Sequence, residues 1–148
     1  MNFVDVLETG TAMPEKFTEA ERSRIMTAVK SRDTIPELIV RRLVHRLGYR
    51  FRLHCRDLPG TPDIVLPKLR KVINVHGCFW HRHNCPHGRI DPVKNADYWV
   101  QKRKRNALRD RVSLKSLRVS GWKVMTVWEC EIKQRGRLLH RLVRFLTR

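Results

Sequence analysis

A short run from His76 to Cys85, with the sequence HGCFWHRHNC, concentrates side chains that bind metals or transfer protons. Within it, Cys78, His83 and Cys85 have the spacing Cys-x4-His-x-Cys. Two thiolates and an imidazole suit tetrahedral zinc, and the distant Cys130 can supply a fourth ligand after a predicted strand. A shell of three cysteines and one histidine leaves no position for water. The sequence therefore predicts a structural zinc site.

Other interpretations of this run stay open. His81 and His87 are competing ligands, although His81 and His83 would point in opposite directions if the run is extended. The cysteines could instead be small buried apolar residues. Cys55 has no histidine neighbours, and we interpret it as a core or surface residue. Disulfides are disfavoured in a cytosolic chain, so metal binding remains the first interpretation.

A second reactive centre is predicted where Asp63 opens a short apolar run. Magnesium prefers oxygen ligands and keeps several waters. A carboxylate at a strand start, with a carbonyl on the adjacent strand, can hold this ion against a phosphate, where it neutralises charge and activates water. His76 or His81 could exchange the proton, because imidazole titrates near neutral pH. Ordinary structural roles remain open, since Asp63 follows a turn and Glu37 completes a capping box with Thr34.

Hydrophobic periodicity indicates the elements that must position these side chains. The expected helices begin at residue 18 and cover 35–47, 96–119 and 135–145, and the expected strands cover 49–54, 63–66, 71–76 and 122–128. Thr18 and Glu21 form the capping box of the first helix. In the long basic helix, the candidate inward residues are Trp99, Leu108, Val112 and Leu117.

This order of elements, α-α-β-β-β-α-β-α, implies an α/β fold with a central mixed sheet and helices on both faces. Residues 1–17 show no clear period, and we expect them to form a flexible N-terminal arm. Residues 18–148 are expected to form a single domain, because their number suits one hydrophobic core.

The composition is strongly basic, with 32 Lys and Arg against 14 Asp and Glu and a formal net charge of +18. Such an excess favours a polyanionic partner, nucleic acid first, with an anionic membrane surface as the rival. No apolar run approaches the roughly 20 residues that span a bilayer. The first residues lack the basic start of a signal peptide. We therefore expect a cytoplasmic protein, associated with the nucleoid through DNA and not with a membrane.

Taken together, these residues resemble the very-short-patch repair (Vsr) DNA mismatch endonuclease family. The match runs in the expected order over most of the chain. The matching stretches are Arg22–Met26, Ser31–Glu37, Leu58–Asp63, Val75–Cys85, Tyr98–Trp99, Lys104–Asp110 and Gly121–Cys130.

The resemblance implies a restriction-endonuclease-like fold, a variant of the PD-(D/E)xK nuclease core. It implies a magnesium-dependent enzyme that nicks one strand of double-stranded DNA, 5′ of the thymine in a T:G mismatch. Such mismatches arise when 5-methylcytosine deaminates, so a functional pairing with a cytosine-5 DNA methyltransferase is expected. One nick needs one active site, and we expect a monomer on DNA.

The resemblance also implies roles for individual residues. Asp63 and the backbone carbonyl of Val75 would bind magnesium. His81 would act on the attacking water, His76 would assist at the phosphate, and Glu37 would orient the water and the metal shell. The family often has Thr at the position of Val75, a change that a main-chain ligand tolerates.

Two further sets of residues are implied in the same way. The structural zinc ligands would be Cys78, His83, Cys85 and Cys130. The residues that wedge into the base stack would be Phe79, Trp80 and Met26. A wedge has a physical basis, because a mispaired step costs less to open and an apolar side chain gains stacking there.

Two other functions remain open at this point. One is a less selective nicking endonuclease of the same fold, which would cut several mismatches or unmodified duplex. The other is a non-catalytic zinc-containing DNA-binding module.

Overall fold

The computed structural model describes residues 18–28, 32–93 and 95–148, and its sheet has the predicted mixed topology. The strands lie in the order β1 (Arg52–Leu53), β2 (Ile64–Leu66), β3 (Lys71–His76) and β4 (Lys123–Trp128). The first two pairings are antiparallel, and β3 pairs with β4 in parallel. β1 is much shorter than the predicted strand 49–54, because Tyr49 and Phe51 pack against the core outside the strand pairing.

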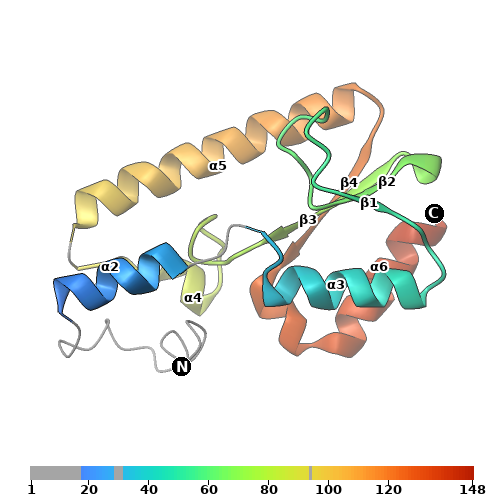
Figure 1. Cartoon of the computed structure of the whole chain (residues 1–148). Helices are drawn as coiled ribbons and strands as arrows, with labels where there is room; N and C mark the ends of the chain where they lie inside the picture. The colour runs from blue at the N-terminus through green and yellow to red at the C-terminus, as the bar shows by residue number, and fades with distance from the viewer. Residues whose placement is uncertain (1–17, 29–31, 94) are drawn as a thin grey trace.

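The predicted helices are present within a few residues of their expected bounds. They are α2 (Glu19–Ala28), α3 (Ile35–Arg46), α5 (Ala96–Val119) and α6 (Arg135–Thr147), with short helical turns at α4 (Pro86–Arg89), Pro67–Leu69 and Glu129–Lys133. Figure 1 shows α5 on one side of the sheet and α3 with α6 on the other. In the described part of the chain, no helix combines the length and the apolar character that crossing a bilayer requires.

Alternation along the strands produces a core on each face of the sheet. Ile64, Leu66 and Ile73 pack with the apolar sides of α3 and α6. The intervening Val65 and Val72 point to the opposite face, where Leu117 of α5 covers them. The sheet is therefore buried between two helical layers, as the element order predicts.

The inward face of α5 differs from the predicted one. Leu108 and Val112 are 61% and 57% exposed, whereas Arg103 is 2% exposed. Residues at helical spacing along the inward stripe are mostly polar. They are Trp99, Arg103, Asn106, Asp110, Ser113 and Leu117.

This polar stripe has a physical reason. Most of α5 packs against the loop after β3, whose free carbonyls need hydrogen-bond donors. Arg103 donates to the carbonyls of Gly88 and Ile90, and Asn106 donates to the carbonyl of Trp80. The prediction that Leu108 and Val112 face inward is wrong, because the side of α5 that meets this loop carries Arg103 and Asn106.

Candidate functional site

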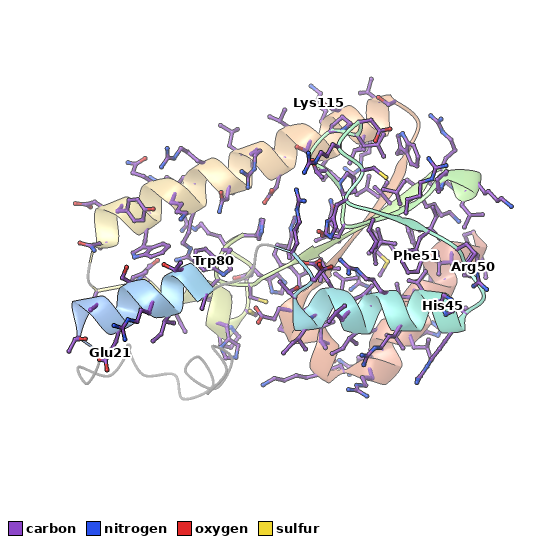
Figure 2. The ribbon with its side chains drawn as sticks, viewed as in Figure 1. Glu21, His45, Arg50, Phe51, Trp80 and Lys115 are labelled. Atoms are coloured by element: carbon purple, nitrogen blue, oxygen red, sulfur yellow. The ribbon has the colours of Figure 1, made fainter. Side chains whose placement is uncertain are left out.

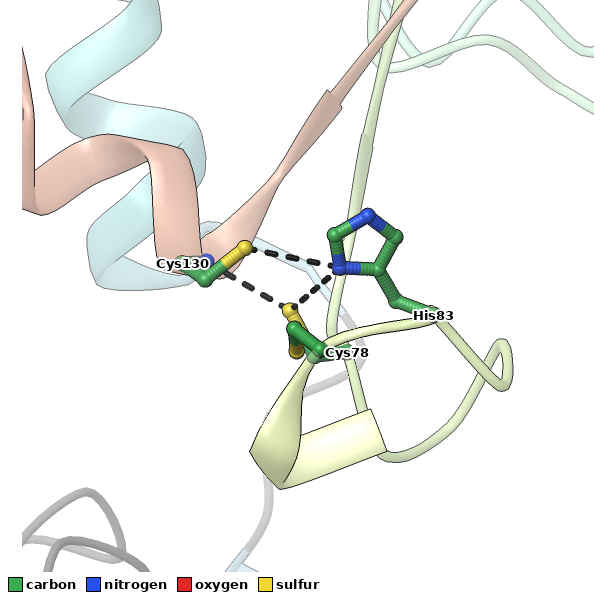
Figure 3. Close-up of side chains that lie close together, drawn as sticks. Cys78, His83 and Cys130 are labelled. Atoms are coloured by element: carbon green, nitrogen blue, oxygen red, sulfur yellow. Dashed lines mark hydrogen bonds between the residues drawn. The ribbon is translucent and has the colours of Figure 1, made fainter. Parts of the chain in front are cut away.

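Four side chains from separate parts of the chain form a compact Cys/His cluster. The ligand atoms of Cys78, His83, Cys85 and Cys130 all lie within 4.8 Å of one another. The Nδ1 atom of His83 is 3.6 Å from Sγ of Cys78 and 3.4 Å from Sγ of Cys130 (Figure 3). A tetrahedral zinc with ordinary bond lengths holds sulfur and nitrogen about 3.6 Å apart. The four donors therefore fit one zinc ion.

Main-chain amides surround the sulfur atoms of this cluster. The amide of Cys130 lies 3.4 Å from Sγ of Cys78, and the amide of Gly88 lies 3.4 Å from Sγ of Cys85. Burial raises the pKa of the Cys78 and Cys130 thiols, so a bound metal must displace their protons. Any side chain on Gly88 would collide with the His83 carbonyl, 1.9 Å from the added Cβ. The loop can close around the cluster only with glycine at this position.

The two candidates for proton transfer, His76 and His81, form a separate cluster with Asp110, and His87 belongs to neither cluster. The rings of His76 and His81 stack with centroids 3.9 Å apart and planes 9° apart. Nδ1 of His81 hydrogen-bonds to a carboxylate oxygen of Asp110 on α5. His81 therefore lies outside the Cys/His cluster and is oriented by a carboxylate.

Sequence reasoning missed Asp110. Its signals are its place at the end of the matching stretch Lys104–Asp110 and its acidic side chain on the polar inward stripe of a basic helix, seven residues after Arg103. The contact with His81 joins residues 29 positions apart, and local patterns carry no information on such a pairing.

The surroundings of His76 and Asp110 shift their pKa values in ways that give His76, His81 and Asp110 different chemistry. Burial, followed by the nearby charge of His81, lowers the pKa of His76 to about 4. Burial works to raise the pKa of Asp110, but the hydrogen bond and charge of His81 outweigh it and leave that pKa below its ordinary value. At neutral pH, His76 is thus uncharged and Asp110 is ionised. The ionised Asp110 fixes the proton of His81 on Nδ1 and leaves Nε2 as the free basic nitrogen.

Asp63 lies directly before β2, and its carboxylate reaches across to β3. Oδ2 of Asp63 accepts a hydrogen bond of 2.7 Å from the amide of Val75. Burial raises the pKa of Asp63 to about 6, the Val75 amide opposes this rise, and the charge of Glu37 adds to it. The structure therefore brings Asp63 against the main chain of Val75 and within the electrostatic reach of Glu37.

Glu37 is a helix-capping residue and also part of a buried ionic cluster. Its amide lies 3.4 Å from the Thr34 hydroxyl, which is one half of the predicted capping box; the Glu37 carboxylate accepts from the amide of Asp33 and not from that of Thr34. It is only 3% exposed, and its Oε2 accepts hydrogen bonds from Arg41 and from the amide of Asp33. A carboxylate that only caps a helix does not need to be buried against an arginine.

The proposed wedge residues fall in an aromatic group on the same loop. Phe79 and Trp80 contact each other edge to face at 5.2 Å, and Trp99 of α5 contacts both. Arg103 lies over the Phe79 ring at 4.8 Å. Figure 2 labels Trp80, and it also shows Lys115 projecting from α5 away from the sheet. The third wedge candidate, Met26, belongs to α2, and its side chain lies outside the described residues.

The sequence of this chain resembles those of several known endonucleases. A family model described as DNA mismatch endonuclease Vsr matches residues 14–87. Type II nicking enzyme V.XorIIP from Xanthomonas oryzae pv. oryzae is 47% identical over 130 residues, which are 88% of this chain and 95% of that protein. DNA mismatch endonuclease Vsr from Escherichia coli is 38% identical over 126 residues, which are 85% of this chain and 80% of that protein.

A solved structure shows the same fold. The catalytic domain of homing endonuclease I-Bth0305I superposes with a TM-score of 0.52, covering 76% of this chain and 94% of that domain. The sequences are 18% identical, so this likeness shows the fold alone. The predicted restriction-endonuclease-like fold is confirmed.

The raised pKa of Asp63 predicts that this residue lowers stability at neutral pH. Its pKa moves from 3.8 in the unfolded chain to about 6 in the fold. The folded state therefore binds more protons between these values, and stability falls as pH rises through about 4 to 6. Without divalent metal, Asp63→Asn should stabilise the protein at pH 8 by about 2–3 kcal/mol, and the gain should vanish below pH 4.

Urea unfolding across this pH range measures the effect. Asp57→Asn is the matched control, because it removes the same charge from an exposed position. A pH-independent difference between wild type and Asp63→Asn would contradict the raised pKa of Asp63.

Proposed function

The chain belongs to the Vsr family of DNA mismatch endonucleases, and from this premise we propose that it nicks one strand of duplex DNA 5′ of the thymine in a T:G mismatch. The proposal rests on the hydrogen bond between His81 and Asp110 and on the stacking of His81 on His76. His81 lies on the loop that follows β3, and β3 contacts Asp63 through the amide of Val75. Deamination of 5-methylcytosine creates such mismatches, so a cytosine-5 DNA methyltransferase is the expected functional partner.

Asp63 supplies the carboxylate oxygens that a magnesium ion prefers. Asp63 and the main-chain carbonyl of Val75 would hold it, together with waters and phosphate oxygens. When bound, magnesium supplies charge neutralisation at the phosphate and lowers the pKa of a bound water. Glu37 lies close enough for its charge to raise the pKa of Asp63, which supports its proposed role in orienting the water and the metal shell.

His81 is the proposed general base. Its Nδ1 proton is held by Asp110, so its Nε2 can take a proton from the attacking water. His76 has a pKa near 4 and remains neutral, so it can donate one hydrogen bond to a phosphate oxygen but adds no positive charge. The different roles proposed for the two histidines are those that the family resemblance implies.

Recognition of the mismatch is assigned to the aromatic loop and the basic helix. Phe79 and Trp80 are half-buried at the surface of the loop, and with Met26 they are the proposed wedge. The exposed Lys and Arg of α5 would contact phosphates, which position the duplex without reading sequence. We propose that one copy of the chain acts on DNA, because each of these groups occurs once.

The Cys/His cluster is the proposed structural zinc site. Its four donors leave no open position, so its role is to tie the loop after β3 to the end of β4. Zinc binding would fix both ends of the loop that carries His81 and the proposed wedge residues Phe79 and Trp80.

The function is tested on a duplex that carries one T:G pair, with magnesium. Wild type should cut only the thymine strand, 5′ of the mispaired thymine, and Asp63→Ala should be inactive. Asp110→Asn should lower kcat about 10²-fold or more, because His81 loses its oriented proton. The same assay with other mismatches and with homoduplex measures selectivity. Equal cutting of these substrates would favour the less selective nuclease, and tight binding without any metal-dependent cutting would favour the non-catalytic module.

The zinc proposal predicts one zinc per chain in metal analysis of purified protein. Cys130→Ser should lose the zinc and unfold at a lower temperature, because the closed shell loses one of its four ligands. Cys55→Ser is the matched control, since Cys55 lies outside the cluster, and it should keep the metal. Full zinc content and full stability in Cys130→Ser would refute the four-ligand site.

A further inference from the structure

Arg41 lies buried among three potential metal ligands beside the proposed magnesium site. Its side chain is 10% exposed. Nη1 binds a carboxylate oxygen of Asp33 at 2.5 Å, and Nη2 binds Glu37 at 2.8 Å and Nε2 of His54 at 2.9 Å. Asp33, Glu37 and His54 could together hold a metal ion by their spacing. The guanidinium already contacts all three, so the positive charge at this position is Arg41 itself.

This contact determines the tautomer of His54. A guanidinium can donate hydrogen bonds but cannot accept them. Nε2 of His54 must therefore accept the bond from Arg41, and the ring carries its proton on Nδ1. This Nδ1 atom faces Asp63, with 3.8 Å between Nδ1 and Oδ1.

His54 consequently lies between two carboxylates of the proposed active site. Nε2 is 3.8 Å from Oε2 of Glu37, and Nδ1 is 3.8 Å from Oδ1 of Asp63. The main chain fixes this position, because the amide of His54 donates to the carbonyl of Asp63 where β1 pairs with β2. The other carboxylate oxygen of Asp63 accepts from Val75. Asp63 therefore has an N–H group near each of its two oxygens.

We propose that Arg41 and His54 are positioning residues for the magnesium ion. Arg41 holds Glu37 and keeps His54 in the tautomer with hydrogen on Nδ1, and His54 directs that hydrogen at Oδ1 of Asp63. The 3.8 Å separation is longer than a hydrogen bond, and rotation of the carboxylate toward a bound ion closes it. Outer-shell partners of this kind orient a metal-binding carboxylate and strengthen its binding. The inference rests on the proposed function, since it takes Asp63 as the metal ligand.

Two substitutions of matched chemistry test the direction of this contact. His54→Asn places its amide near the position of Nδ1 and keeps a donor for Asp63. His54→Gln places its amide near Nε2 and keeps only an acceptor for Arg41. Both variants keep a polar side chain, so a role limited to folding affects them alike.

The measurement is Mn²⁺ binding by electron paramagnetic resonance, on protein bound to a T:G duplex with a non-cleavable linkage at the nicking position. His54→Gln and His54→Ala should bind Mn²⁺ about tenfold more weakly than wild type, and His54→Asn should recover most of the affinity. His45→Ala on the exposed side of α3 should bind as wild type does. Melting temperatures report folding separately.

The outcomes separate this inference from the proposed function. Wild-type affinity in His54→Gln, or equal affinities in the Asn and Gln variants, would overturn the role of His54. Asp63→Asn is the reference for the ion site itself. If Asp63→Asn also binds Mn²⁺ like wild type, the assignment of Asp63 fails. If only Asp63→Asn loses binding, the magnesium site stands and the positioning role fails.

Discussion

The parallel pairing of β3 with β4 is the constraint on which both proposed centres depend. It sets His76 opposite Trp128 at the ends of the two strands. Cys78 and Cys130 each follow two residues later, and they therefore lie close together. Trp128 stacks on the ring of His83 at 4.2 Å and meets the ring of His76 edge-on at 5.4 Å. One indole thus separates the Cys/His cluster from the pair His76–His81 while contacting both. A change in the register of these strands would displace the proposed zinc ligands and the proposed catalytic histidines together.

Helix α5 provides the second constraint, and it acts through polar contacts more than through apolar packing. Arg103 and Asn106 hold carbonyls of the loop after β3, and Asp110 holds His81 on the same helical face. Further along this face, Ser113 meets the turn before Asp63, where a Cβ added to Gly60 would lie 2.7 Å from the serine Cβ. The helix therefore links the loop that carries the proposed base to the turn that carries the proposed metal ligand.

Much of this arrangement could be predicted from sequence, and the parts that could not share a physical cause. Periodicity indicated α3 and α6, a capping box indicated α2, and thiolates near histidines indicated the Cys/His cluster, because these signals are local. Asp110 was missed because its partner His81 lies 29 positions away. Arg41 and His54 were missed because a helix and a strand end 13 positions apart give no local sign of their contact. The inward assignment of Leu108 and Val112 failed for a related reason, since periodicity assumes an apolar neighbour. Polar contacts between distant segments are thus what the structure adds.

We propose that one loop serves two centres, with zinc on one side of Trp128 and His81 on the other. Anomalous diffraction at the zinc edge, from crystals of the protein on a T:G duplex with a non-cleavable linkage, tests this arrangement directly. We expect one zinc bonded to Cys78, His83, Cys85 and Cys130, with Nε2 of His81 facing the same phosphate that Asp63 approaches. Zinc bonded to His81, or His81 and Asp63 facing different phosphates, would contradict it.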